Sequence, residues 1–170
     1  PRRPRGPGPG GRVAARGAMA EGATVLVCGR SVDQARLRLA REIGVHHVVD
    51  VETEDPVSLV QALTYGNGAD VVVECAGSAA AIDTALALVR KRGRYSQMGL
   101  PGRAVEVDFE RVAYKELQLS GGIGQRRPAW KRALKLMEAG LIPTEKLVTH
   151  DFGMGDWEKG FVVAEQQQGI

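Results

Sequence analysis

Short runs of β-branched residues alternate with longer stretches of helical period along most of this chain. Between the runs, apolar residues recur at three- and four-residue spacing, which is typical of amphipathic helices. The pattern predicts strands at residues 24–28, 47–50, 70–74, 94–98 and 117–120. Strands and helices that alternate in this way predict an α/β domain built on a parallel sheet.

Two of the predicted helices have clear ends. The first covers residues 33–43 and stops at Gly44, a residue suited to the left-handed conformation after a helix. The second follows Ser78 and ends before Gly93, and its apolar stripe consists of Ile82, Ala85, Leu86 and Val89. We expect this stripe to pack on the sheet, in which the three valines at residues 71–73 would form a strand buried on both faces.

Two later helices carry large aromatic residues. Pro128 can open the first of them and Asp156 can cap the second. The aromatic residues at helical spacing are Trp130, Trp157 and Phe161. We expect them in the core, since large aromatics are mostly buried on average.

The charge of the chain is concentrated at one end. The 170 residues are 44% hydrophobic, which fits one globular domain and excludes a disordered chain. The formal net charge is +3, but five arginines fall within the first sixteen residues, where no acid occurs. The remainder is mildly acidic, so the basic residues form a short Pro/Gly-rich end and not a stripe interleaved with aromatics. Nucleic-acid binding is therefore the function class that the sequence favours least.

Cysteine content and hydropathy indicate the compartment. The two cysteines, Cys28 and Cys75, are too few for a disulfide scaffold and lack metal-ligand spacing. No apolar run reaches about 18 residues, the length that a membrane helix needs. The Arg-rich start is also too rich in Pro and Gly for an amphipathic transit peptide. These observations predict a cytoplasmic protein with reduced thiols, no membrane partner and no complete zinc site in this chain.

A glycine-rich segment at residues 6–11 contains the pattern G-x-G-x-x-G. In a dinucleotide-binding fold the first glycine, here Gly6, allows a tight turn, and Gly8 lets the backbone approach the pyrophosphate. Gly11 would allow close packing of helix on strand. The phosphates would then bind the N–H groups at the helix start. By itself the pattern is not specific in a Gly/Pro-rich stretch.

The residues around this segment conflict with a standard dinucleotide fold. A buried strand should precede the glycine loop, but residues 1–5 contain two prolines and three arginines. We therefore expect the first strand to be absent or nonstandard. Arg12, Arg16 and Gly17 also interrupt the apolar stripe of the helix that follows.

The adenosine ribose of a dinucleotide should be met about 20 residues after the loop. The residues there are Gly29, Arg30 and Ser31, where an NAD site usually has an acidic side chain. Arg30 and Ser31 can both donate hydrogen bonds to a 2′-phosphate, and Arg36 is a second arginine near the adenosine end. This pattern favours NADP over NAD. The alternative is that Arg30 and Arg36 are solvated surface charges.

Seven segments resemble one enzyme family when they are taken together with their order along the chain. They are Ala20-Glu21-Gly22-Ala23, Ala40-Arg41-Glu42-Ile43-Gly44, Asp70-Val71-Val72-Val73-Glu74-Cys75-Ala76-Gly77, Met98-Gly99-Leu100, Tyr114-Lys115-Glu116-Leu117, Asp156-Trp157-Glu158-Lys159-Gly160-Phe161 and, at the start, Gly6-Pro7-Gly8-Pro9. Together they resemble the coenzyme-binding half of the zinc-type medium-chain alcohol dehydrogenases, in particular the sorbitol and threonine dehydrogenase branch.

This resemblance implies a Rossmann-type, doubly wound parallel sheet whose strand ends hold a nicotinamide dinucleotide. The loop Cys75, Ala76 and Gly77 would pass the adenosine and ribose side. Met98, Gly99 and Leu100 would lie near the nicotinamide, and Gly122 and Ile123 near its carboxamide. For Cys75 a buried structural thiol fits better than a reactive one, because no neighbouring base is visible.

The resemblance also shows what this chain does not contain. Family members carry a GroES-like catalytic domain with the zinc ligands, and these 170 residues have no counterpart of it. His46, His47 and His150 do not have the spacing to replace that zinc site. We expect residues 1–16 to be an atypical N-terminal segment and residues 17–170 to be the Rossmann domain. The ending at residues 166–170 indicates either a C-terminal truncation or a disordered Gln-rich tail.

The leading functional hypothesis is the coenzyme-binding part of an NAD(P)-dependent oxidoreductase. It would transfer a hydride between the cofactor and a small polyol or amino alcohol, with zinc supplied by the missing domain. The main alternative is a noncatalytic nucleotide-binding or oligomerisation module. A methyltransferase is a third hypothesis, disfavoured by the segments between residues 114 and 161. A homo-oligomer is expected by analogy with the family alone.

Overall fold

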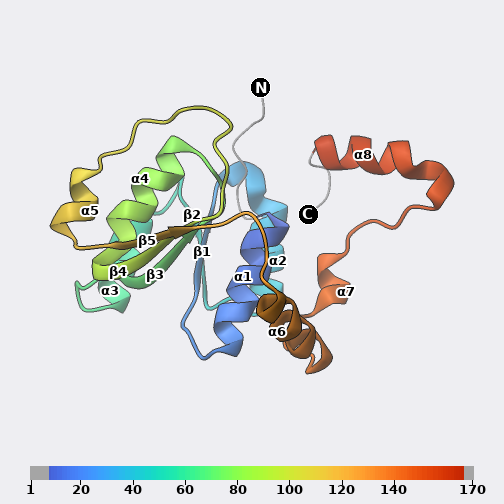
Figure 1. The fold of residues 1–170 in the computed structure, drawn as a ribbon, viewed down its shortest axis with the longest axis horizontal. Helices are drawn as coiled ribbons and strands as arrows, with labels where there is room; N and C mark the ends of the chain where they lie inside the picture. Colours follow the sequence, from blue (N-terminus) through green and yellow to red (C-terminus); the bar gives the residue numbers. More distant parts are fainter. Residues whose placement is uncertain (1–7, 167–170) are drawn as a thin grey trace.

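Helix α1 (Pro9–Ala20) begins the part of the chain that a computed structural model describes, residues 8–166. From there strands and helices alternate (Figure 1). The strands are β1 (Leu26–Gly29), β2 (His47–Asp50), β3 (Ala69–Glu74), β4 (Val89–Gln97) and β5 (Gln118–Gly121). The helices after α1 are α2 (Gln34–Glu42), α3 (Pro56–Leu63), α4 (Ala79–Leu88), α5 (Glu110–Tyr114), α6 (Arg127–Glu138), α7 (Thr144–Leu147) and α8 (Trp157–Glu165).

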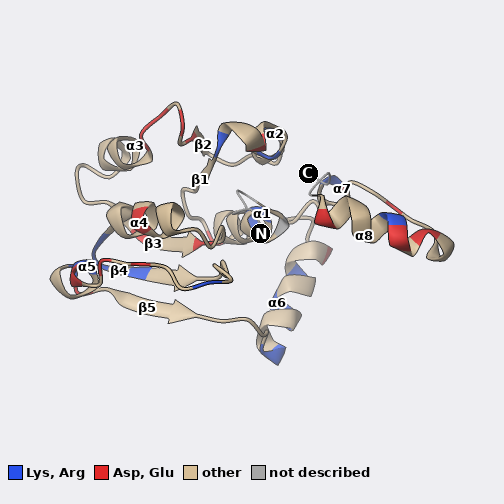
Figure 2. Cartoon of the chain, turned by 90° about the horizontal axis from the view of Figure 1, so that it is seen from above, with Lys and Arg blue, Asp and Glu red and all other residues tan. Residues whose placement is uncertain are grey.

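All strand pairs in the described residues are parallel, which confirms the predicted α/β fold. β1 pairs with β2, and a second sheet has the order β3-β4-β5. Figure 2 shows β3, β4 and β5 side by side in one layer, with β1 and β2 apart from them. Each predicted strand overlaps an observed one, but β4 begins at Val89 and not at Arg94. Val89 and Gly93 therefore belong to this strand and not to the end of α4.

No strand in residues 8–166 joins β1 to β3, so each of them pairs on one edge only. The expectation of an absent or nonstandard first strand stays a prediction. Residues 1–5, on which that expectation was based, lie outside the described residues, and so do residues 167–170 of the Gln-rich ending.

Two apolar clusters hold the layers together. The first joins Ala15 of α1, Val27 of β1 and three residues of the second helix and its end: Leu39, Ala40 and Ile43. The second joins Ile82, Ala85 and Leu86 of α4 to Tyr95 of β4. The stripe predicted for the helix after Ser78 therefore packs on the sheet as expected.

Lys115 closes the C-terminal end of α4 from a distant part of the sequence. Its ammonium group donates to the carbonyl oxygens of Leu86 (2.7 Å), Ala87 (2.9 Å) and Val89 (2.8 Å). These carbonyls lack helical partners, and a cation at a helix C-terminus is stabilised by the helix dipole. Lys115 thus ties α4 to the turn between α5 and β5.

We expect Lys115→Met to lower the free energy of unfolding by about 2 kcal/mol, because it removes three charge-assisted hydrogen bonds and leaves carbonyls half-buried. Urea unfolding followed by circular dichroism measures the change. Lys131→Met, on the exposed surface of α6, is the matched control and should change stability by less than about 0.5 kcal/mol. Equal losses in the two variants would contradict the role of Lys115.

The prediction that the valine run is buried on both faces is wrong for the described residues. Val71 is 52% exposed and Val73 44% exposed, whereas Val72 packs on the second cluster. Alternate side chains of a strand point to opposite faces, and only the α4 side of this sheet is covered.

The prediction of buried aromatics is also wrong. Trp130, Trp157 and Phe161 are all more than half exposed. Figure 1 shows α7 and α8 leading away from the sheets, so nothing in residues 8–166 covers their apolar side chains. Asp156 stands at the N-cap of α8, but its carboxylate accepts from Lys159 and not from the helix backbone.

The buried face of helix α1 includes one of the arginines that interrupt its apolar stripe. Arg12 is fully buried with Ala15, while Val13 and Ala14 are exposed. Arg16 donates to the carbonyl oxygen of Leu141 (2.7 and 3.1 Å) and to that of Ile43 (2.9 Å). Arg16 thus anchors this helix to its neighbours.

Helix α3 was missed by the sequence pattern. Asp55 caps it by accepting from the N–H groups of Val57 (3.0 Å) and Ser58 (3.1 Å), and Pro56 is its first residue. The Asp-Pro pair is the signal that could have revealed it, since both residues are favoured at a helix start. Among the helices of residues 8–166, none is long and apolar enough to cross a membrane.

Candidate functional site

The carboxyl ends of β3, β4 and β5 lie at one edge of the sheet. Parallel register pairs Glu74 with Gln97, and Gln97 with Gly121. The loops that carry the predicted cofactor residues 75–77, 98–100 and 122–123 follow directly. In open α/β sheets, ligands bind outside the carboxyl ends of the strands, so the topology gathers these three loops where a ligand would bind.

Glu74 holds two of these loops together. Its side chain is buried, and its carboxylate accepts from the N–H groups of Ala76 (2.7 Å) and Gly77 (2.9 and 3.0 Å). It also accepts from the side-chain amide of Gln97, which donates in addition to the carbonyl oxygen of Gly99 (2.7 Å). One carboxylate therefore fixes the backbone after β3 against the backbone after β4.

Gly77 and Gly99 meet in this contact. A Cβ on Gly99 would lie 2.2 Å from the Gly77 nitrogen, and one on Gly77 would lie 2.7 Å from the Leu100 carbonyl. The two glycines serve close packing between loops, because a side chain on either would enter the other backbone. Met98, Leu100 and Ile123 have exposed side chains in the loops at this edge of the sheet.

The glycine segment begins α1 beside β3. Gly6 lies outside the described residues, while Gly8 is the N-cap of α1 with no side chain bonded to the helix start. A Cβ on Gly11 would lie 3.7 Å from the Cys75 Cβ, and one on Gly10 would meet nothing within 4 Å. An uncapped helix start with open space at Gly10 fits a pyrophosphate, since its N–H groups point toward the place where an anion binds.

The end of β1 meets the end of β2. Gly29 is paired with Asp50, whose buried carboxylate accepts from the Ser31 hydroxyl (2.7 Å) and the Gln34 amide (2.8 Å). The Ser31 hydroxyl is the main cause that lowers the pKa of Asp50. Glu52 accepts from the Ser31 N–H (2.9 Å).

Asp50 and Glu52 were missed by sequence reasoning. The signal that could have found them is the position of Asp50 at the end of a predicted strand beside the strand that ends at Gly29.

The Arg36 side chain is engaged by a neighbouring carboxylate. It forms an ion pair with Asp33 (3.1 Å), and both side chains are largely buried. Burial and the charge of Arg36 lower the pKa of Arg12. Arg30, in contrast to Arg36, is exposed. The contribution of either arginine to cofactor binding stays a prediction.

Neither cysteine is activated. Burial raises the pKa of Cys28 to about 11. Burial and the nearby Glu74 carboxylate raise the pKa of Cys75. Both are free thiols that stay protonated near neutral pH, which supports the structural interpretation of Cys75.

Residues 8–166 do not fit a zinc centre. No group of three or more His, Cys, Asp or Glu residues in residues 8–166 is arranged to hold a metal. His46 accepts from the Val25 N–H (3.1 Å), and His150 stacks on Phe152. Both contacts join these histidines to neighbouring residues of the fold.

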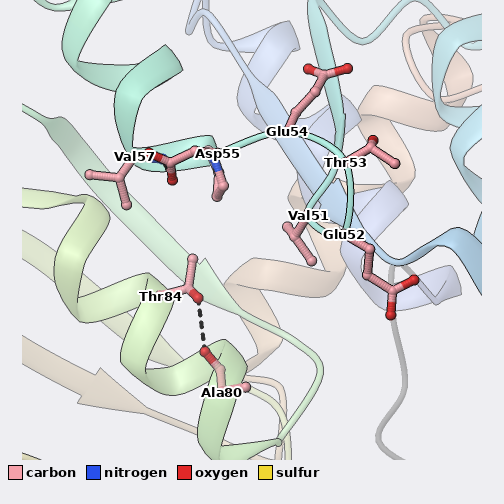
Figure 3. Close-up of a pocket in the computed structure, with 9 residues that line it drawn as sticks. Val51, Glu52, Thr53, Glu54, Asp55, Val57, Ala80 and Thr84 are labelled. Atoms are coloured by element: carbon pink, nitrogen blue, oxygen red, sulfur yellow. Dashed lines mark hydrogen bonds between the residues drawn. The ribbon is translucent and has the colours of Figure 1, made fainter.

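A hollow of about 470 Å³ lies between the loop after β2 and helix α4 (Figure 3). Residues 51–57 form one wall, and Ala80 and Thr84 form the other. None of the predicted cofactor residues lines it. Figure 3 shows Glu52 and Glu54 on this loop with their side chains pointing to different sides.

Comparison with known proteins identifies relatives of this arrangement. Residues 10–139 match the family model described as zinc-binding dehydrogenase. The chain is 37% identical over 166 residues to a sorbitol dehydrogenase from Halalkalibacterium halodurans, covering 97% of this chain and 48% of that protein. It is 34% identical over 165 residues to an L-threonine 3-dehydrogenase from Bacillus subtilis, covering 96% and 47%.

Solved structures are similar over the same span. 2R,3R-butanediol dehydrogenase from Bacillus subtilis aligns with a TM-score of 0.84 at 27% identity, over 96% of this chain and 47% of that one. A zinc-binding dehydrogenase from Sinorhizobium meliloti 1021, determined bound to NADP, aligns with a TM-score of 0.72 at 28% identity, over 85% and 43%. The chain thus spans about half the length of the relatives it matches.

Proposed function

Because the chain belongs to the zinc-binding dehydrogenase family, we propose that it forms the coenzyme-binding part of an NAD(P)-dependent oxidoreductase. The observation that carries this proposal is the meeting of the glycine start of α1 with the end of β3, where Gly11 lies beside Cys75. A helix N-terminus at the carboxyl edge of a parallel sheet is suited to the pyrophosphate of a dinucleotide.

In our proposal each loop at this edge binds a different part of the cofactor. The N–H groups at the start of α1 would bind the pyrophosphate, and the turn at Gly29, Arg30 and Ser31 would receive the adenosine ribose. Residues 75–77 would pass the adenosine side, with residues 98–100 and 122–123 around the nicotinamide. The bound cofactor supplies hydride chemistry, while these residues bind and orient it.

We propose a small polyol or amino alcohol as the substrate class, on the names of the sorbitol and threonine dehydrogenases that resemble this chain. The described residues do not fit zinc, so we assign the metal and the alcohol contacts to residues outside this chain. A cytoplasmic location and a homo-oligomer stay predictions of the same proposal.

The first prediction is that the 170-residue chain binds NADH or NADPH with a dissociation constant on the order of micromolar. Titration of the nicotinamide fluorescence measures it. Gly10→Glu should weaken binding by about tenfold or more, because it places a carboxylate at the start of α1 where the pyrophosphate would lie. Gly155→Glu, at another open glycine far along the chain, is the control. No saturable change with either cofactor would overturn the proposal.

A noncatalytic nucleotide-binding module is the second candidate, favoured by the absence of a metal-binding group in residues 8–166. Alcohol-dependent reduction of NAD or NADP in the presence of zinc tests the second candidate. Turnover by the purified chain excludes the second candidate. Binding without turnover is the result expected of a coenzyme-binding part on its own.

A further inference from the structure

Two carboxylates, one at the end of β2 and one in the loop after it, reach the end of β1. The parallel pairing of Gly29 with Asp50 brings the ends of the strands side by side. The N–H of Val51 donates to the Gly29 carbonyl oxygen (2.9 Å) and continues that pairing into the loop. Asp50 and Glu52, two residues apart, then lie close enough to accept hydrogen bonds from Ser31.

Both hydrogen-bond donors of Ser31 are engaged by these carboxylates. The hydroxyl donates to Asp50 (2.7 Å), and the backbone N–H donates to Glu52 (2.9 Å). They are the groups that would otherwise hold a 2′-phosphate at this turn. Asp50 is fixed in addition by Gln34 (2.8 Å) and by the N–H of Glu52 (3.1 Å), so it is a built part of the turn.

The charges around Ser31 favour a neutral group over an anion. Arg36 is bound to Asp33, behind the turn. At the turn itself the carboxylates of Asp50 and Glu52 both bind Ser31, and the Ser31 hydroxyl keeps the pKa of Asp50 below its ordinary value. A 2′-phosphate dianion would meet like charge here, whereas a ribose 2′-hydroxyl can donate a hydrogen bond to a carboxylate.

We propose that Glu52, held on the Ser31 N–H, makes this turn select NAD(H) over NADP(H). The proposal rests on the function proposed above and names the residue that sets its cofactor preference. The acidic side chain comes from the loop after β2, in place of the side chain that Gly29 lacks. It reverses the preference for NADP that Arg30 and Ser31 suggested when the sequence was considered alone.

The test compares NADH and NADPH affinities of the 170-residue chain and its Glu52→Gln variant by fluorescence titration. The wild-type chain should bind NADH the more tightly. Glu52→Gln removes the charge and keeps the shape, so NADPH affinity should rise by about tenfold with little change for NADH. Competition by 2′,5′-ADP against 5′-AMP measures the same preference on the adenosine half alone.

Two further variants make the result specific. Glu54→Gln removes an equal charge from the same loop, but Figure 3 shows this side chain pointing away from Glu52. It should leave the NADPH to NADH ratio within about twofold of the wild-type value. Arg30→Ala in the Glu52→Gln background should abolish the gain for NADPH, because it removes the exposed cation next to Ser31 that could pair with a 2′-phosphate.

The outcomes separate the two proposals. Binding of both cofactors with the same ratio in wild type, Glu52→Gln and Glu54→Gln overturns the role of Glu52 and leaves the proposed function intact. A wild-type preference for NADPH overturns it as well. Binding of neither cofactor by any variant overturns the proposed function itself.

Discussion

Replacing Gly99 by alanine is expected to lower the free energy of unfolding by about 3 kcal/mol and to abolish dinucleotide binding. The new Cβ would lie 2.2 Å from the Gly77 nitrogen and 2.6 Å from a carboxylate oxygen of Glu74. Real Cβ atoms do not approach backbone this closely, so the loops after β3 and β4 must separate. Urea unfolding measures the stability, and nicotinamide fluorescence measures the binding.

Gly124→Ala is the matched control for this prediction. Gly124 follows β5 at the same edge of the sheet, and a Cβ there would meet nothing within 4 Å. We expect its stability to stay within about 0.5 kcal/mol of the wild-type value. If Gly99→Ala were as stable as this control, the contact between the two loops would be looser than the structure shows.

The second large effect is expected at Glu74. Glu74→Ala should lower the free energy of unfolding by about 3 kcal/mol, because it leaves the N–H groups of Ala76 and Gly77 and the amide of Gln97 without their acceptor. The loops that the carboxylate joins would lose their relative position. We therefore expect weaker binding of NADH and of NADPH to the same degree, measured together with the unfolding midpoint.

Two variants show whether the carboxylate itself is needed. Glu74→Gln keeps the shape but offers one acceptor oxygen in place of two, so its stability should fall between those of wild type and Glu74→Ala. Glu138→Ala, on exposed α6, should have little effect on stability or binding. A Glu74→Gln variant indistinguishable from wild type would show that one oxygen suffices to hold both loops.

Local sequence pattern was enough to predict the elements that depend only on residues adjacent in the sequence. The strand at residues 47–50 was predicted with its observed bounds, and the helix after Ser78 has its stripe on the sheet. Gly44 ends α2 in the left-handed conformation, as expected (φ +84°). These features depend on period, capping and backbone freedom, which are properties of a few adjacent residues.

The candidate site was predictable only in part. The loops that would surround a cofactor follow from the strand ends, but the role of Glu74 does not, because its partner Gln97 lies 23 residues away in the sequence. In the same way, the aromatic residues of α6 and α8 have core-like spacing, and only the fold shows that nothing in residues 8–166 covers them.

By itself the sequence determined a parallel α/β domain, the glycine start of its first helix and the loops at its carboxyl edge, because period and glycine position are local. The tertiary structure decided which charged residues lie close together in space. Parallel pairing of β1 with β2 carries Asp50 and Glu52 to Ser31, twenty residues away in the chain, and so changes the expected preference from a 2′-phosphate to a 2′-hydroxyl. Electrostatic preference depends on distances in space, and these exist only once the strands have paired.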